Sequence, residues 1–165
     1  MLSSARNRPD PNRSLLGFAV GGVEYAVPIS SVRQIVNPIS LSDLPHSPPA
    51  VIGVAEFRSE VVPVIDMRVR LGLPPAPSQH RPKWILLGLH QHTVGLCVDR
   101  VTEVFGTGGA DLRPVPELGG GEDIRGIEGA VARDGHLVFV LEVSTFDSFT
   151  SELKPPSGQP AREQP

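Results

Sequence analysis

Apolar and polar residues alternate in short stretches along most of this chain, and glycine, proline or a pair of polar residues separates one stretch from the next. Alternation with a period of two is typical of β-strands, and two such stretches joined by a tight turn predict a hairpin. Four hairpins are predicted, with turns at Gly21-Gly22, Arg58-Ser59, His90-Gln91 and Asp134-Gly135. With the remaining short runs, the pattern gives about nine or ten strands.

Three short helices are also predicted, over residues 29–36, 67–71 and 143–149. The first and last place their apolar residues three or four apart, which is the spacing of one helix face. The second starts after Asp66, a good N-cap residue, and ends at Gly72, which can take the left-handed C-cap conformation. The last helix, with Val143, Phe146 and Phe149 on one face, is expected to pack across the rest of the fold.

Irregular strands are predicted at three further places. Pro63 lies within a predicted strand and confines it to a sheet edge or a bulge, because proline cannot donate to a ladder. Residues 41–44 form a brief strand, and residues 98–105 form a strand with a kink near Asp99-Arg100. Asp99 and Arg100 are expected to pair or to cap locally.

A single sheet of so many short strands would curl or split, so the sequence predicts a mainly β fold of two small barrels packed side by side. The polar segments 1–13 and 150–165 are expected to be disordered, which leaves residues 14–149 as the folded part.

Composition narrows the possible functions. A net charge of -3 and a pI near 5.9 provide no electrostatic footprint for a phosphate backbone, so nucleic-acid binding is not expected. The single cysteine, Cys97, lies in an apolar strand and is read as a core residue in a reducing compartment. His90 and His92 have too few neighbours in sequence for a metal site, and the glycines at 106–109 and 119–121 are read as loops. Without a signal peptide or a membrane span, the protein is expected in the cytoplasm.

Five motifs then appear in one order. They are VRQI at 32–35, LPHSPPAVIGV at 44–54, EFRS at 56–59, VVPVIDMRVRLG at 61–72 and VGLCVDRV at 94–101. In this order they resemble the CheW family, the adaptor proteins of chemotaxis-type signalling. The resemblance implies two SH3-like five-stranded β-barrels with short helices and a C-terminal helix.

The same resemblance implies a non-enzymatic adaptor that has no cofactor and no metal. Its implied partners are the cytoplasmic tip of a chemoreceptor and the regulatory domain of a CheA-type histidine kinase, with no nucleic acid and no membrane insertion. Recruitment to receptor clusters is expected. The receptor is expected to lie in a groove between the barrels, touching residues Val27, Gln34, Ile35, Val54, Phe57, Arg58 and Ser59.

Two positions depart from the family pattern. The family's glutamate in the first motif is Gln34 here, and the family's glycine in the third motif is Ser59. Arg58 can accordingly hydrogen-bond Gln34, or turn to Glu56 or Glu60. Ser59 costs ~1 kcal/mol if the turn requires positive φ.

Two alternatives therefore stay open. The chain can be a divergent relative that binds only the kinase or only the receptor. If it keeps the kinase or array contact with weakened or altered receptor recognition, Gln34→Glu with Ser59→Gly is expected to raise affinity for receptor tips. It can also be a small-ligand or nucleic-acid-binding barrel, which would need a pocket of ionisable groups or a basic aromatic face.

Overall fold

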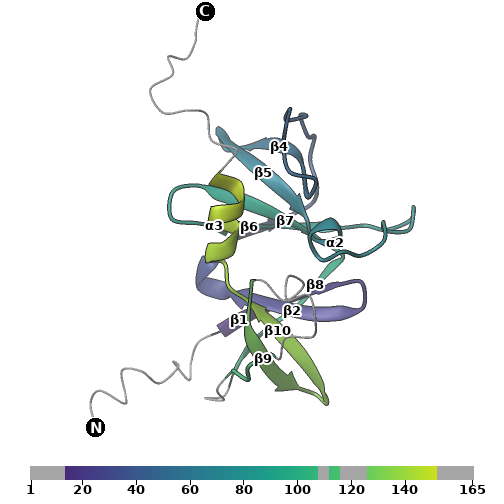
Figure 1. Ribbon diagram of the computed structural model, residues 1–165, viewed down its shortest axis with the longest axis vertical. Coiled ribbons are helices and arrows are strands. Elements are labelled where there is room, and N and C mark those ends of the chain that lie inside the picture. Colours follow the sequence, from purple (N-terminus) through teal and green to yellow (C-terminus); the bar gives the residue numbers. More distant parts are fainter. Residues whose placement is uncertain (1–13, 108–111, 116–125, 152–165) are drawn as a thin grey trace, which may run out of the picture.

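The computed structural model describes residues 14–107, 112–115 and 126–151, and the side chains of 148–151 are not described. The chain forms two five-stranded sheets that lie one above the other (Figure 1). We call them the first and the second barrel. The first has the strand order β8-β1-β2-β10-β9, and the second has the order β3-β6-β7-β5-β4. Of the segments predicted to be disordered, 1–13 and 152–165 lie outside the described residues, whereas residues 150–151 belong to the C-terminal helix, so that tail was predicted to begin two residues too early.

The first barrel contains β1 (Ser14–Val20), β2 (Val23–Pro28), β8 (Arg100–Gly106), β9 (Ile127–Arg133) and β10 (His136–Leu141). The second contains β3 (Val32–Val36), β4 (Val51–Phe57), β5 (Glu60–Asp66), β6 (Lys83–Gly88) and β7 (Thr93–Val98). Each barrel has one parallel pairing, β2 with β10 and β5 with β7, among otherwise antiparallel ones. The mainly β, two-barrel prediction is confirmed.

All four predicted hairpins are confirmed. β1–β2, β4–β5 and β9–β10 each close through two residues with positive φ, as a type I′ turn requires. The β6–β7 connection is one residue longer on each side than the predicted turn, and the Leu89 N–H donates to the carbonyl of His92 (2.8 Å). The predicted caps of α2 (Met67–Arg70) are also present, because the Arg68 N–H donates to Asp66 Oδ1 (2.9 Å) and Gly72 has a φ of 73°.

The predicted helix over 29–36 is wrong. Only a single 3-10 turn, η1 (Ile29–Ser31), precedes β3, which pairs with β6. Its residues alternate between partly buried and exposed, a period of two that the helical spacing of the apolar residues obscured. Val32, Ile35 and Val36 are β-branched and pack well on a pleated sheet. Pairing with β6 therefore favoured a strand over a helix in this segment.

Two strand predictions also need correction. Of the two alternatives predicted for the strand with Pro63, the edge is wrong, because β5 lies between β4 and β7. The β4–β5 register does shift beside Pro63, between the pairs Gly53–Val64 and Val51–Ile65, and the ladder with β7 begins at Val64, so Pro63 stands just outside it. The brief strand over 41–44 is reduced to one bridge, Ser42 with Val54. That bridge requires a glycine at Gly53, where a Cβ would lie 2.7 Å from the Ser42 carbonyl oxygen.

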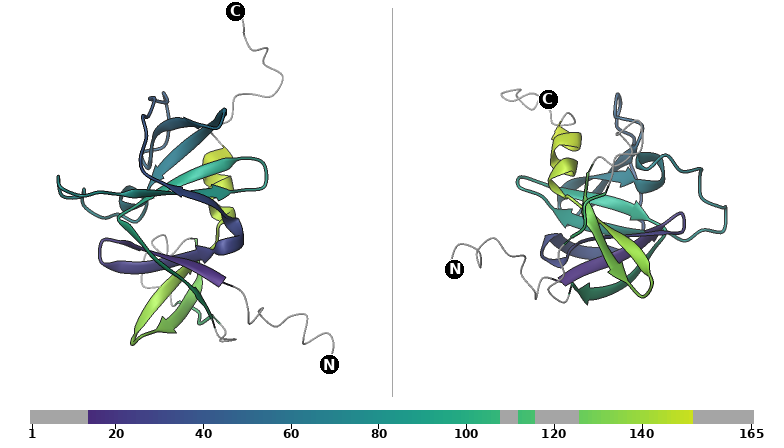
Figure 2. Two further views of the ribbon diagram at one scale, coloured as in Figure 1. Left: turned by 180° about the vertical axis from the view of Figure 1, so that it is seen from behind. Right: turned by 60° about the horizontal axis from the view of Figure 1, so that its bottom comes forward.

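The chain passes from the second barrel back to the first between β7 and β8. β7 ends at Val98, Asp99 intervenes, and β8 then pairs with β1 (Figure 2). The edges β8 and β9 of the first sheet are joined by Arg133, which pairs with Glu103 (2.6 Å) and lies 4.2 Å from the Phe105 ring centroid.

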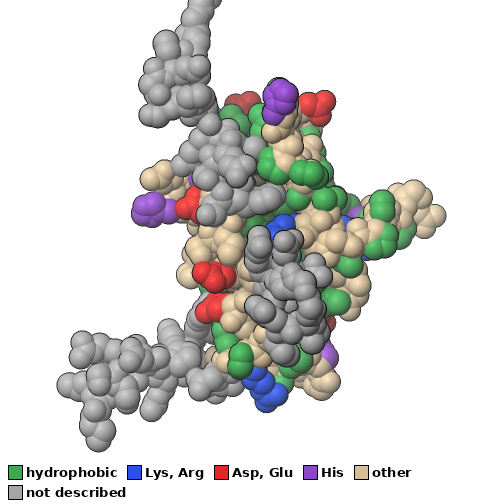
Figure 3. All heavy atoms as spheres, viewed as in Figure 1, with side chains coloured by type: hydrophobic (Ala, Val, Ile, Leu, Met, Phe, Trp, Pro, Cys, Tyr) green, Lys and Arg blue, Asp and Glu red, His purple; other side chains and the backbone are tan. Residues whose placement is uncertain are grey.

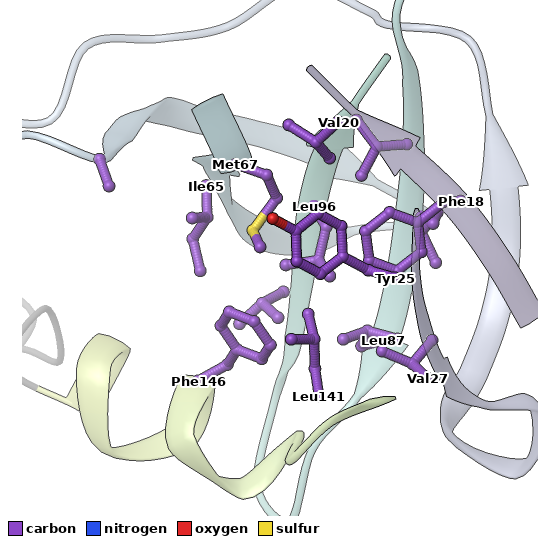
Figure 4. Close-up of a cluster of buried hydrophobic side chains, with 14 of the residues drawn as sticks. Phe18, Val20, Tyr25, Val27, Ile65, Met67, Leu87, Leu96, Leu141 and Phe146 are labelled. Carbon is purple, nitrogen blue, oxygen red and sulfur yellow. The ribbon is translucent and has the colours of Figure 1, made fainter. Parts of the chain in front are cut away.

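The largest buried cluster lies between the barrels rather than inside either one. It joins Phe18, Tyr25 and Val27 of the first barrel to Ile65 and Leu96 of the second (Figure 4). α3 (Ser144–Ser151) adds Phe146, which is 4% exposed, so the predicted packing of this helix across the barrels is confirmed for Phe146. The side chain of Phe149 is not described. The two barrels therefore share one apolar interface.

Candidate partner-binding site

The β4–β5 hairpin ends in a strained turn. Arg58 and Ser59 have φ angles of 51° and 67°, although neither is a glycine. Left-handed backbone costs roughly 1–2 kcal/mol at a residue with a side chain. The turn does require positive φ at Ser59, so the predicted conformational cost applies there, and the same cost applies at Arg58. Both residues are exposed at the tip.

A hollow of about 150 Å³ lies beside this tip on the second barrel. Its lining is Arg33, Gln34, Phe57, Arg58, Glu60, Leu86 and Thr93. Pockets for drug-sized ligands have volumes of ~300–1,000 Å³, so this hollow fits a side chain rather than a metabolite. We call it the tip hollow.

A bulge in β3 explains how two consecutive residues line the tip hollow. Val32 pairs with Leu87 and Gln34 with Leu86, so Arg33 is an extra residue without its own partner. A bulge turns neighbouring side chains toward the same side of a strand. In a regular strand, Arg33 and Gln34 would point to opposite faces.

The acidic group of the tip hollow is already engaged. Glu60 Oε1 accepts a hydrogen bond from Thr93 Oγ1 (3.2 Å) and lies 3.9 Å from a guanidinium nitrogen of Arg33. Arg58 instead lies over the Phe57 ring, 5.5 Å from its centroid. Within the described part of the chain, Arg58 has no hydrogen bond or ion pair, so the expected contacts with Gln34, Glu56 or Glu60 are not formed.

Three of the seven predicted contact residues, Gln34, Phe57 and Arg58, line the tip hollow, and Ser59 lies beside them at the tip. Ile35 follows Gln34 on a strand, points to the opposite face and is 41% exposed. Val54 is partly buried opposite Pro63.

The predicted contact of Val27 with the receptor is wrong. Val27 is fully buried in the cluster between the barrels and cannot touch a partner there. The predicted receptor groove between the barrels stays a prediction, and the tip hollow is a different place, because its lining comes from the second barrel alone. Sequence reasoning named Glu60 only as a possible partner of Arg58, and it missed Arg33, Leu86 and Thr93, since these three come beside the tip through the pairings of β3 with β6 and of β5 with β7.

A second polar cluster joins the barrels. Asp99 accepts two hydrogen bonds from the Arg68 guanidinium (2.9 and 2.8 Å) and one from the Gly21 N–H (2.8 Å). His80 Nε2 lies 3.5 Å from Asp99 Oδ1. Asp99 therefore pairs with a residue 31 positions away, and its expected local pairing is wrong. We call this cluster the Asp99 clamp.

The electrostatics of the clamp favour the ionised carboxylate. Burial alone would raise the pKa of Asp99, but the hydrogen bonds from Arg68 and Gly21 and the nearby positive charges outweigh it and lower that pKa. Arg68 and Asp99 belong to two of the five motifs in the sequence, 61–72 and 94–101. The clamp thus gives both motifs one structural role.

Comparison with known proteins identifies the family. A family model described as a CheW-like domain matches residues 14–148, most of the chain. The chain belongs to the CheW family. The chemotaxis protein CheW of Rhizobium meliloti is 29% identical over 145 residues, covering 88% of this chain and 94% of that protein. A probable chemotaxis protein CheW of Rhizobium etli is 32% identical over 139 residues, covering 84% and 90%.

A solved structure agrees in fold. The scaffolding protein TtCheW from Thermoanaerobacter tengcongensis superposes with a TM-score of 0.71 at 24% identity, covering 79% of this chain and 88% of that one. The resemblance seen in the motifs is confirmed. As a CheW-family member, the chain is a non-enzymatic scaffold and adaptor of chemotaxis signalling.

The single cysteine of this CheW-family chain is Cys97, which is partly buried. Burial, followed by the charge of Asp66, raises the pKa of the Cys97 thiol to about 11, so it is protonated near neutral pH and is a poor nucleophile. Over the described residues, no three His, Cys, Asp or Glu side chains come together as a metal site would require. None of the helices in those segments has the length and apolar character that crossing a bilayer requires.

Acidic, basic and apolar side chains are interspersed on the face drawn in Figure 3. The coloured part of this face shows no continuous basic patch of the kind that binds a phosphate backbone.

Proposed function

We propose that this CheW-family protein connects the cytoplasmic tip of a chemoreceptor to the regulatory domain of a CheA-type histidine kinase in the cytoplasm, and that the tip hollow contacts the receptor. The observation that carries the proposal is the tip hollow itself. It places Gln34, Phe57 and Arg58 around one small hollow, lined by both apolar and charged side chains, next to a strained turn. Strained backbone concentrates at binding sites, where the surrounding fold maintains it.

A connecting protein needs a second surface for its second partner. The first barrel offers an open hollow at the β2–β10 pairing, lined by Val23, Leu137 and Phe139 with the ion pair of His136 and Glu24 (3.1 Å). Val23 and Leu137 are exposed at 36% and 45%. The two hollows lie on different barrels, which supports simultaneous binding of two neighbours.

The expected interfaces are small. Contacts that bury at or below ~1,200 Å² give weak, micromolar binding, and an array strengthens such contacts through multivalency. We therefore expect modest affinity for each isolated partner and a marked gain when both are present.

The test uses the purified protein, a helical-hairpin fragment of the receptor tip and the kinase regulatory domain. Co-sedimentation is expected to recover all three together. Arg58→Glu is expected to reduce receptor recovery and to leave kinase recovery unchanged. Arg100→Glu, an exposed charge reversal on the first barrel, is the matched control.

Two results would contradict the proposal. Absence of receptor binding by the natural protein, while the kinase still binds, favours the alternative of a relative that has kept one partner. Unchanged receptor recovery by folded Arg58→Glu removes the tip hollow from the interface.

A further inference from the structure

We propose that the tip hollow receives a carboxylate side chain, aspartate or glutamate, from the bound receptor helix, and that Arg58 is its ligand. This inference rests on the proposed function and specifies the chemistry of the same contact. It commits to one occupant, a carboxylate of a partner protein, because the charges of the described residues leave one cation unmatched.

The charge balance is direct. The lining of the tip hollow carries two cations, Arg33 and Arg58, and one carboxylate, Glu60. Glu60 lies toward Arg33 and Thr93. One positive charge therefore remains at Arg58, whose contact within the described residues is the face of the Phe57 ring.

Gln34 keeps that charge available. It lines the same cavity as Arg58, and its side-chain amide is neutral. A carboxylate at position 34 would compete with the partner for the guanidinium. A neutral amide leaves the bidentate face of Arg58 free and can itself donate a second hydrogen bond to an incoming carboxylate.

The size and walls of the tip hollow match one acidic side chain. A cavity of about 150 Å³ accommodates a side chain, and the apolar surfaces of Phe57 and Leu86 can cover its methylene groups. Partial exclusion of water by these walls strengthens the pairing of a guanidinium with a carboxylate.

The backbone strain at the tip agrees with this role. Arg58 has a φ of 51°, a conformation in which glycine or asparagine would cost less. An arginine here is unfavourable for the turn, so its presence indicates that the side chain is used.

The experiment titrates the full-length protein with the receptor-tip fragment at low salt. Arg58→Gln, which keeps the side-chain length and removes the charge, is expected to weaken binding about tenfold, and Arg58→Lys is expected to weaken it less. The difference in receptor affinity between the natural protein and Arg58→Gln should shrink near ~1 M salt, where the Debye length falls to ~3 Å. Arg100→Gln removes an equal charge from the first barrel and serves as control.

Gln34→Glu gives the sharpest test, because two explanations predict opposite changes in receptor affinity. If the missing family glutamate had weakened the receptor contact, this substitution would raise the affinity, whereas the present inference predicts that it lowers the affinity. An internal carboxylate should occupy Arg58 and weaken receptor binding several-fold while leaving kinase binding unchanged. If Gln34→Glu strengthens receptor binding, the inference is overturned and the tip hollow needs an internal ion pair to function.

The partner side completes the test. Neutralising each acidic residue of the receptor fragment in turn should find one whose loss has no further effect in the Arg58→Gln protein, and reversing both charges should restore binding. If the natural protein binds the fragment and no such residue exists, this inference fails while the proposed function stands. If the natural protein does not bind the fragment, the proposed function fails with it.

Discussion

The Asp99 clamp predicts how strongly one carboxylate stabilises the junction of the two barrels. Asp99 accepts three hydrogen bonds, from Arg68 on α2 and from Gly21 in the β1–β2 turn. In Asp99→Asn, one oxygen becomes an N–H₂ group that faces donors. Hydrogen bonds to charged groups are worth roughly 1.5–3 kcal/mol, and the Asp99 side chain is still 17% exposed, so solvent screening lowers the value. We expect a loss of about 1–2 kcal/mol.

For a domain of this size, that loss lowers the midpoint of thermal unfolding by about 4–7 °C at pH 7. Hydrogen exchange gives a local readout, because the Gly21 N–H donates to Asp99 and should exchange faster in the variant. Asp43→Asn, the same change at an exposed carboxylate, is the control and should leave both measurements unchanged.

The pH dependence follows from the direction of the pKa shift. Because the folded pKa of Asp99 lies below its ordinary 3.8, its contribution is fully present above that value and is lost as pH falls through the folded pKa. The natural protein and Asp99→Asn should therefore differ at pH 7 and converge in strong acid. Equal unfolding midpoints at pH 7, or a difference that persists unchanged in strong acid, would refute the assigned role of the clamp.

Three further predictions concern single side chains. Ser59→Gly should stabilise the fold by about 0.5–1 kcal/mol in denaturant unfolding, since φ is 67° there, whereas Ser59→Ala should give no gain. Pairing with Glu24 raises the pKa of His136 above its ordinary 6.5, so an NMR titration should show a lower His136 pKa in Glu24→Gln than in the natural protein. The stabilisation of the fold by this pair is fully present below pH 6.5 and is lost as pH rises through the folded pKa. Cys97, with its pKa raised from 9.0 to about 11, should react about a hundredfold more slowly with iodoacetamide near neutral pH than an ordinary thiol, and fast alkylation of the folded protein would contradict its burial.

The sequence predicted the hairpins well because their turns are local. Gly21-Gly22 and Asp134-Gly135 supply positive φ at the required places, and the flanking alternation sets the register. The cap at Asp66 is equally local, since donor and acceptor lie two residues apart. Local chemistry was sufficient for the hairpins and the cap, but not for β3 or for the arrangement of the strands.

Contacts between remote segments could not be predicted in the same way. The parallel pairings of β2 with β10 and of β5 with β7 join strands through long connections that leave no periodic signal. The pairing of Arg68 with Asp99 depends on where the chain crosses between the barrels. The tip hollow depends on the bulge at Arg33, which appears only when β3 pairs with β6. The motifs contain both Arg68 and Asp99, but only the fold shows that these two residues pair with each other.

The three two-residue turns show where this protein tolerates strain. Two of them contain glycine at one or both central positions, so positive φ costs little there. The third, Arg58-Ser59, contains none, and it is the turn that borders the tip hollow. If stability alone determined turn sequences, this turn would contain glycine or asparagine as well. This turn keeps its backbone strain beside a hollow with a guanidinium that is unpaired within the described residues, and we attribute that to the use of the Arg58 side chain in binding.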